Sequence, residues 1–113
     1  LKDDDIRNLS AFFAAQKPPA VDAAAPADDA LLAAGRKVAQ ANRCASCHLE
    51  NFSGTQATPR LAAQREDYLL KALREFKSGA RRGTGVAAMP EVVYRLADED
   101  LRAVAHFLAR QPP

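Results

Sequence analysis

The feature that most constrains the fold is a five-residue string that contains both cysteines, Cys44-Ala45-Ser46-Cys47-His48. Residues three and four apart lie on the same side of a helical turn, so the two thiols and the imidazole can all contact one planar group. A chain of 113 residues buries only about two-thirds of its unfolded surface, so its stability is marginal unless a non-polypeptide group fills its centre. The cysteine string and the short chain together predict one small domain built around such a group.

Cys-x-x-Cys-His is the attachment signature of a c-type haem. Thioether bonds from Cys44 and Cys47 would fix the macrocycle, and the adjacent imidazole of His48 would become an axial ligand of the iron. We therefore predict one covalently attached haem c as the cofactor.

Three other interpretations of the string remain open. A thioredoxin-like redox pair is expected beside a βαβ pattern, and no alternating strand pattern occurs here. A structural zinc site would need His106 as its fourth ligand and would combine it with the adjacent Cys47 and His48, an unusual pair. A disulfide would close a very short loop and leave His48 without a role.

The second axial ligand is predicted to be Met89, the single methionine, in a glycine-flanked loop directly before Pro90. A lone methionine is more often core filling. With a haem in place, a thioether on the opposite face would raise the potential and close the iron to small ligands. The alternative ligand is His106, but it lies on a helix whose buried face is marked by Leu101 and Leu108, so we expect it at the surface or edge.

Apolar residues recur at helical spacing and no strand pattern is visible, so we expect an all-α fold of about three to five helices wrapped around the haem. Residues 17–30 are rich in Pro, Ala and Asp without periodicity and are predicted to be a linker, which leaves residues 31–113 as the haem domain. The predicted elements are a helix within 1–16, a helix from Asp28 or Asp29 to about Asn42, loop at 51–64, a helix from Glu66 to Gly79 with Tyr68, Leu69, Leu73 and Phe76 on one face, loop at 80–90, a helical turn at 91–95 and a last helix from Asp98 to Arg110.

The start of the chain resembles its end. A shift of 95 residues sets LKDDDIRNLSAFFAAQKP on LADEDLRAVAHFLARQPP, with acidic residues, apolar spacing and the trailing Gln-x-Pro in register. We therefore predict that residues 1–16 are the closing helix of a preceding, similar domain in a longer chain. The alternative is a chance likeness of two amphipathic helices. Either way, the apolar stripe of residues 1–16 is expected to be docked against its own domain, a neighbour or a second copy of the chain.

Charge and hydropathy exclude some classes of partner. The chain carries 16 basic and 14 acidic side chains, a formal net charge of +2, and the basic excess falls in residues 35–113. The arginines are spread without a nucleic-acid-binding motif, so no nucleic-acid partner is expected. No apolar stretch reaches the length of about eighteen residues that spans a bilayer, and no leader precedes the first acidic run, so we expect an exported protein whose signal has been removed.

The order of these motifs resembles the class I cytochromes c, and most closely the cytochrome c4 and c553 type, over about residues 31–111. The residues that carry the resemblance are Cys44-x-x-Cys47-His48, Pro59-Arg60-Leu61, Tyr68-Leu69, Met89 and the helix start Leu96-x-Asp98-Glu99-Asp100-Leu101. One departure is Leu49, because members of the family commonly have glycine after the histidine.

The resemblance implies roles for further residues. The carbonyl of Pro59 would accept a hydrogen bond from the ligating His48 and orient its ring. Arg60 and Tyr68 fall where such cytochromes contact the haem propionates or the hydrogen bonds around them. First and last helices of the family usually cross through a small residue and aromatics, which makes Gly35 and Phe107 candidates for that contact.

The function implied is that of an electron carrier and not of an enzyme. The domain would carry one electron in a larger respiratory or dehydrogenase-linked chain, in a bacterial periplasm, because thioether attachment follows export. Its partners would be redox proteins, a neighbouring cytochrome domain or a dehydrogenase or oxidase subunit, steered by Lys77, Arg81 and Arg82 near the haem edge; for these three, a solvated basic turn is the alternative. If Met89 does not bind, the alternative function is a haem enzyme or a gas or peroxide sensor with an open iron.

Overall fold

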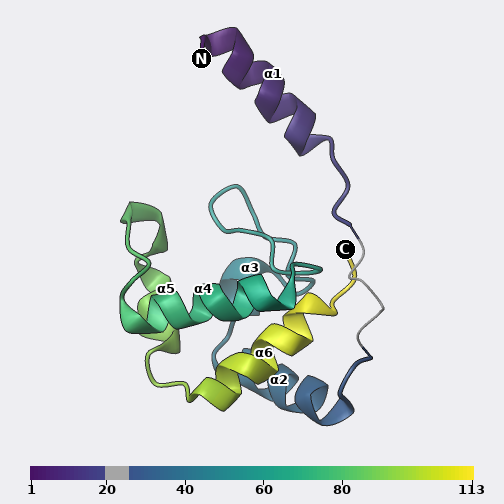
Figure 1. Cartoon of the computed structure of the whole chain (residues 1–113), viewed down its shortest axis with the longest axis vertical. Helices are drawn as coiled ribbons and strands as arrows, with labels where there is room; N and C mark the ends of the chain where they lie inside the picture. The colour runs from purple at the N-terminus through teal and green to yellow at the C-terminus, as the bar shows by residue number, and fades with distance from the viewer. Residues whose placement is uncertain (20–25) are drawn as a thin grey trace.

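The computed structural model describes residues 1–19 and 26–113, and within them all regular structure is helical (Figure 1). The elements are α1 (Asp3–Ala14), α2 (Asp29–Ala41), α3 (Ala45–His48), α4 (Glu66–Ser78), the 3-10 turn η1 (Thr84–Val86), α5 (Ala88–Val93) and α6 (Asp98–Ala109). The all-α prediction is confirmed. Of the predicted linker, residues 20–25 lie outside the described residues, and its last two positions are already helical because α2 begins at Asp29.

Helix α6 forms the centre of the domain and packs against both α2 and α4 (Figure 1). A helix that is apolar on all sides is a buried helix, and α6 fits that pattern over its last two turns. Its buried residues are Leu101, Ala103, Val104, Ala105, His106, Phe107, Leu108 and Ala109. The alanines among them leave room for a neighbouring helix on either side.

The ends of the main helices lie where the sequence predicts them. Asp28 caps α2, since its carboxylate accepts the backbone N–H of Leu31 at 3.0 Å. Helix α4 ends at Gly79, which adopts the left-handed conformation with φ 78°. At the start of α6 the backbone N–H of Ala97 donates to the carboxylate of Asp100 at 3.1 Å.

Helices α2 and α6 touch at Gly35 and Phe107, as predicted. A Cβ atom added to Gly35 would lie 2.6 Å from the Cβ of Phe107 and would also collide with the carbonyl of Ala103. The ring of Phe107 meets that of Phe52 edge to face, with centroids 5.8 Å apart. The helix crossing is therefore close because position 35 has no side chain.

The segment before α6 departs from the prediction. Residues 80–90 were expected to be loop, but η1 lies within them and α5 begins at Ala88, so that Met89 and Pro90 form its first turn. Proline is tolerated there because the first N–H groups of a helix have no acceptor within the helix. The helical turn expected at 91–95 is the remainder of α5, which ends at Val93.

Helix α1 has no buried residue and lies apart from the other helices in Figure 1. Its large apolar side chains are exposed: Ile6 by 51%, Leu9 by 45%, Phe12 by 58% and Phe13 by 67%. The expected docking of this stripe is thus not made with the rest of the described chain.

Candidate functional site

The Cys-x-x-Cys-His string forms a single helical turn directly after α2. The N–H of Cys44 donates to the carbonyl of Ala39 at 3.0 Å, which closes the end of α2 across Arg43, a residue in the left-handed conformation with φ 54°. The N–H of His48 donates to the carbonyl of Cys44 at 3.0 Å. Both thiols are free, that of Cys44 half-buried and that of Cys47 exposed. The turn therefore holds two thiols and one imidazole together on a rigid element.

The imidazole of His48 is buried and has a fixed tautomer. Its Nδ1 lies 2.9 Å from the carbonyl oxygen of Pro59, and a carbonyl can only accept, so Nδ1 carries the hydrogen and donates it. The other nitrogen, Nε2, then keeps its lone pair and can act as a metal ligand. This is the hydrogen bond that the resemblance to the class I cytochromes c implies.

The loop that supplies Pro59 folds back onto α3 through contacts that were not predicted. The hydroxyl of Thr58 donates to the carbonyl of Cys47 at 2.8 Å, and the N–H of Gly54 donates to the carbonyl of His48 at 3.1 Å. Gly54 has φ 75°, and a Cβ there would lie 2.5 Å from the carbonyl oxygen of Thr58. A glycine among turn-forming residues was the available signal, since only glycine permits this close return of the chain.

Arg60 presents an unpaired cationic group. Its side-chain nitrogen Nη1 is buried and has no hydrogen-bond partner. Buried polar atoms are almost always paired, so this nitrogen calls for an acceptor that the polypeptide does not supply. An anionic group of a ligand next to Pro59 fits that requirement.

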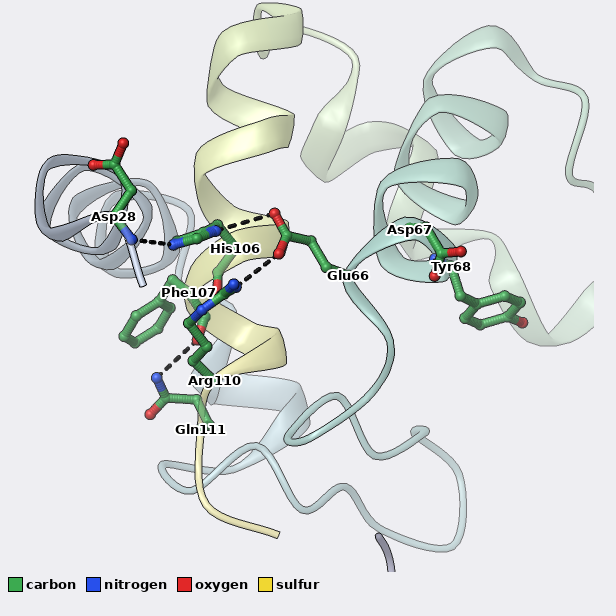
Figure 2. Close-up of polar contacts among 8 residues, drawn as sticks. All are labelled: Asp28, Glu66, Asp67, Tyr68, His106, Phe107, Arg110 and Gln111. Carbon is green, nitrogen blue, oxygen red and sulfur yellow. Dashed lines mark hydrogen bonds and ion pairs between the residues drawn. The ribbon is translucent and has the colours of Figure 1, made fainter. Parts of the chain in front are cut away.

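Tyr68 lies on the exposed side of α4, next to Arg81. Leu69 and Leu73 of α4 are buried, but Tyr68 is 43% exposed. Its hydroxyl accepts a hydrogen bond from Arg81 at 3.3 Å, and the Arg81 guanidinium lies 5.1 Å from the ring centroid of Phe76. Figure 2 shows Tyr68 pointing away from the polar cluster at the start of α4. Tyr68 therefore does not share the burial of Leu69 and Leu73, with which the sequence places it on one face, and its contact with the haem propionates stays a prediction.

Met89, in the first turn of α5, is half-buried and packs against the hydrophobic core. Cys44 and Leu61 pack against the same core cluster.

His106 is not at the surface or edge, so that prediction is wrong. The ring is 5% exposed, because α2 and α4 cover α6 from both sides. Its Nδ1–H donates to Glu66 at 3.0 Å, and its Nε2 accepts the backbone N–H of Asp28 at 3.0 Å (Figure 2). Both ring nitrogens are thereby occupied, and His106 is unavailable as an iron or zinc ligand.

Glu66 joins His106 to Arg110, which donates to the second carboxylate oxygen at 2.7 Å (Figure 2). Partial burial works to raise the pKa of Glu66, but the hydrogen bonds from Arg110 and His106 outweigh it and hold the pKa below its ordinary value. Glu66 is therefore ionised at neutral pH.

Two of the other interpretations of the string, the thioredoxin-like redox pair and the structural zinc site, are disfavoured. Burial raises the pKa of the Cys44 thiol, whereas redox-active Cys-x-x-Cys pairs depend on a lowered pKa. Over residues 1–19 and 26–113, no group of three or more His, Cys, Asp or Glu side chains is arranged to hold a metal ion.

In the same part of the chain, none of the helices is long and apolar enough to cross a membrane.

Comparison with known proteins gives consistent matches. The sequence profile of the family described as cytochrome c matches residues 32–111. Cytochrome c4 of Azotobacter vinelandii is 33% identical over 94% of this chain and 53% of its own length. Cytochrome c-552 of Acidithiobacillus ferridurans is 30% identical over 92% of this chain and 46% of its own length. The chain thus spans about half the length of the curated relatives it matches.

Solved structures agree with the sequence matches. The reduced recombinant cytochrome c4 from Pseudomonas stutzeri superposes with a TM-score of 0.81 at 27% identity, covering 99% of this chain and 62% of that one. The Acidithiobacillus ferrooxidans cytochrome c4 gives a TM-score of 0.78 at 26% identity, covering 97% of this chain and 65% of that one. With the Cys44-x-x-Cys47-His48 turn and the oriented imidazole, these matches show that the chain belongs to the cytochrome c family, as a class I domain of the cytochrome c4 type.

Proposed function

We propose that this domain carries one electron at a time on its covalently attached haem c, with His48 and Met89 as the axial ligands, and that it is not an enzyme. The observation that carries the proposal is the hydrogen bond from His48 Nδ1–H to the carbonyl of Pro59 at 2.9 Å. It directs Nε2 away from the loop and raises the basicity of the ligand, as second-sphere partners of metal-bound histidines do.

The residues present fit the haem of the family. Cys44 and Cys47 are free thiols on one turn with His48, so they would form the two thioether bonds. The unpaired Nη1 of Arg60 would donate to a propionate. When bound, the haem supplies the reversible one-electron couple, while the protein sets its orientation and surroundings.

Two observations support Met89 as the second ligand: its own position and the hydrogen bonds of His106, the alternative ligand. It packs partly buried against the same apolar core as Cys44, while both nitrogens of His106 are already bonded elsewhere. A thioether ligand closes the iron to small molecules. This favours electron transfer over an open-iron enzyme or sensor.

Apolar residues around the site would tune the haem by keeping water away and favouring the less charged ferrous state. Those that the sequence singles out lie in the hydrophobic core or against it: Leu61, Leu69, Leu73, Leu101 and Val104.

We further propose that the domain exchanges electrons with redox proteins in the periplasm of a bacterium. The basic residues expected at the docking edge are partly engaged within the domain. Lys77 donates to the carbonyl of Leu96, and Arg82 donates to the carbonyl of Gly79 at 2.7 Å. Arg81 lies over the rings of Tyr68 and Phe76, where its charge can still steer an acidic partner.

A second part of the proposal is that this domain follows another cytochrome domain in one longer chain, and that α1 is the closing helix of that domain. The bounds of α1, Asp3–Ala14, lie 95 residues before those of α6, Asp98–Ala109. The sequence matches to cytochrome c4 cover 94–96% of this chain but only about half of the relatives, and the solved cytochrome c4 from Pseudomonas stutzeri matches 99% of this chain.

Hydrogen bonds at the two ends of these helices also correspond. At the start of α1 the N–H of Lys2 donates to Asp5 at 2.9 Å, as that of Ala97 does to Asp100 in α6. At the ends, the side-chain amide of Gln16 donates to the carbonyl of Phe12 at 3.2 Å and that of Gln111 to Phe107 at 2.9 Å.

The exposed face of α1 matches the buried face of α6. By the shift of 95 residues, Phe12 takes the place of Phe107, which packs on Gly35 of α2. We therefore propose that a helix equivalent to α2, in a preceding cytochrome domain, covers the apolar face of α1.

A redox titration of the haem-loaded chain, followed by absorption, tests the electron-carrier proposal. We expect a reversible one-electron transition and no spectral change when carbon monoxide is added to the reduced protein. Rapid binding of carbon monoxide would instead indicate the open-iron enzyme or sensor. The mass and haem content of the natural polypeptide test the larger chain: two haems per chain support it, and one haem on a chain of this length contradicts it.

A further inference from the structure

His106 lies where three segments of the domain meet. Its ring bridges the backbone at Asp28, just before α2, to Glu66 at the start of α4, while the residue itself belongs to α6 (Figure 2). Asp28 also lies near the end of the predicted linker, residues 17–30, and caps the first helix of the domain. The ring is buried, and no part of the electron-carrier proposal uses it.

The hydrogen bonds determine the protonation state of the ring. The N–H of Asp28 is a donor, so Nε2 must accept with its lone pair, and the single hydrogen of the neutral ring must lie on Nδ1. That hydrogen points at Glu66. A second proton would have to bind at Nε2, where it would face the N–H of Asp28, and two donors facing each other cannot form a hydrogen bond.

Charged groups face the ring from α4 and α6. On α4, the Glu66 carboxylate accepts the Nδ1 hydrogen, whereas Asp67 is paired with Arg65. On α6, Arg110 shares Glu66 with the ring, while Arg102 is paired with Asp98.

The third element around the ring is α2. Its N-terminus, the positive end of the helix dipole, faces the ring together with the acidic residues Asp28 and Asp29. The Asp28 carboxylate caps the N–H of Leu31 and points away from the imidazole in Figure 2. Asp29 lies in the first turn of the helix.

We infer that His106 is a proton-sensitive clasp, whose neutral ring ties the start of α2 to α4 and α6 and whose protonated ring releases Asp28 while keeping Glu66. The segment that enters the domain at Asp28 is then anchored at neutral pH and freed in acid. In a longer chain this would make the placement of the preceding domain depend on pH. The clasp stands on the contacts of the polypeptide and does not require the proposed iron ligands.

Nuclear magnetic resonance of the full haem-loaded chain in its reduced state tests the clasp directly. The probe is the coupling through the hydrogen bond between the backbone nitrogen of Asp28 and Nε2 of His106, followed from pH 8 to about pH 5, the range over which histidine titrates. We expect the coupling to disappear with the same midpoint as the ring titration. Protection of the Asp28 amide against hydrogen exchange should fall at least about tenfold in parallel.

His106→Gln provides the matched variant, because its amide oxygen can accept the N–H of Asp28 but cannot take up a proton in this range. Its protection at Asp28 should not change with pH beyond the intrinsic exchange rate. The clasp is refuted if the coupling in the unmodified protein persists once the ring is protonated, a measurement that needs no variant. It is equally refuted if His106→Gln loses protection at Asp28 over the same pH range as the unmodified protein.

Discussion

Gly35 and Phe107 are in contact where α2 crosses α6, with no room for a side chain at position 35. The contact joins the helix that leads into the Cys-x-x-Cys-His turn to the most buried helix of the domain. The position of the haem-attachment turn therefore depends on a missing Cβ some two turns earlier in the chain.

We predict that Gly35→Ala lowers the free energy of unfolding of the haem-loaded chain by about 1–3 kcal/mol, because overpacking outweighs the gain in helix propensity. Chemical denaturation measures the change. Gly85→Ala is the matched control, since a Cβ there meets nothing within 4 Å. Equal stability of the two variants would show that the crossing is looser than described.

Leu49 follows His48 in a conformation that strongly favours glycine, with φ 69° and ψ 161°. Such a conformation costs about 1–3 kcal/mol for a residue with a side chain, and glycine loses roughly 0.5–1 kcal/mol through its freer unfolded state. We predict that Leu49→Gly raises the free energy of unfolding by about 1 kcal/mol. Leu49→Ala keeps the Cβ and should bring no gain; a gain from alanine as large as that from glycine would mean that the backbone is not strained.

Phe12 and Phe107 occupy corresponding positions of α1 and α6 but differ in burial, at 58% and 6% exposed. In the present chain we predict that Phe107→Ala lowers the free energy of unfolding by about 3–5 kcal/mol and that Phe12→Ala changes it by less than about 0.5 kcal/mol. In the longer natural polypeptide, Phe12→Ala should become as costly as Phe107→Ala. If it remains neutral there, α1 is not the closing helix of a folded domain.

Because the pKa of Glu66 is lowered in the folded protein, the free energy of unfolding depends on pH in the acidic range. A carboxyl whose pKa is lower in the folded state stabilises the fold above its unfolded pKa of about 4.3, and this contribution is lost as pH falls through the folded value. Because the side chain is 41% exposed, solvent screening limits the contribution to roughly 1 kcal/mol. We predict that Glu66→Gln is less stable than the unmodified protein by this amount at pH 7 and that the difference shrinks as the pH falls below the ordinary pKa of a glutamate. A difference that grows in acid would reverse the sign and contradict the assignment.

Much of this architecture could be predicted from the sequence because local signals and packing agree. Helix α2 begins after a capping Asp28, and α4 ends at Gly79, as their sequences indicate. The His48 to Pro59 hydrogen bond was implied by the resemblance to a family. None of these required knowledge of which distant segments meet.

The sequence did not predict the start of α5 or the burial of His106. Residues 80–90 were predicted to be loop, yet α5 begins at Ala88, because a proline in the first turn of a helix breaks no hydrogen bond. His106 was expected at the surface because a polar residue on an amphipathic helix usually lies there. Its burial depends on α2 and α4 packing on both sides of α6 and on an N–H of Asp28, 78 residues away, that needs an acceptor. No periodicity in the sequence reports such a contact.

The central claim is that Met89 and His48 ligate the haem iron, and absorption spectroscopy of the oxidised and dithionite-reduced protein tests it most directly. We predict sharp reduced bands together with the weak far-red band of sulfur ligation to ferric iron, and loss of the far-red band in Met89→Ala. A haem spectrum that lacks the far-red band in the unmodified protein and shifts at once on addition of cyanide or carbon monoxide would contradict the claim.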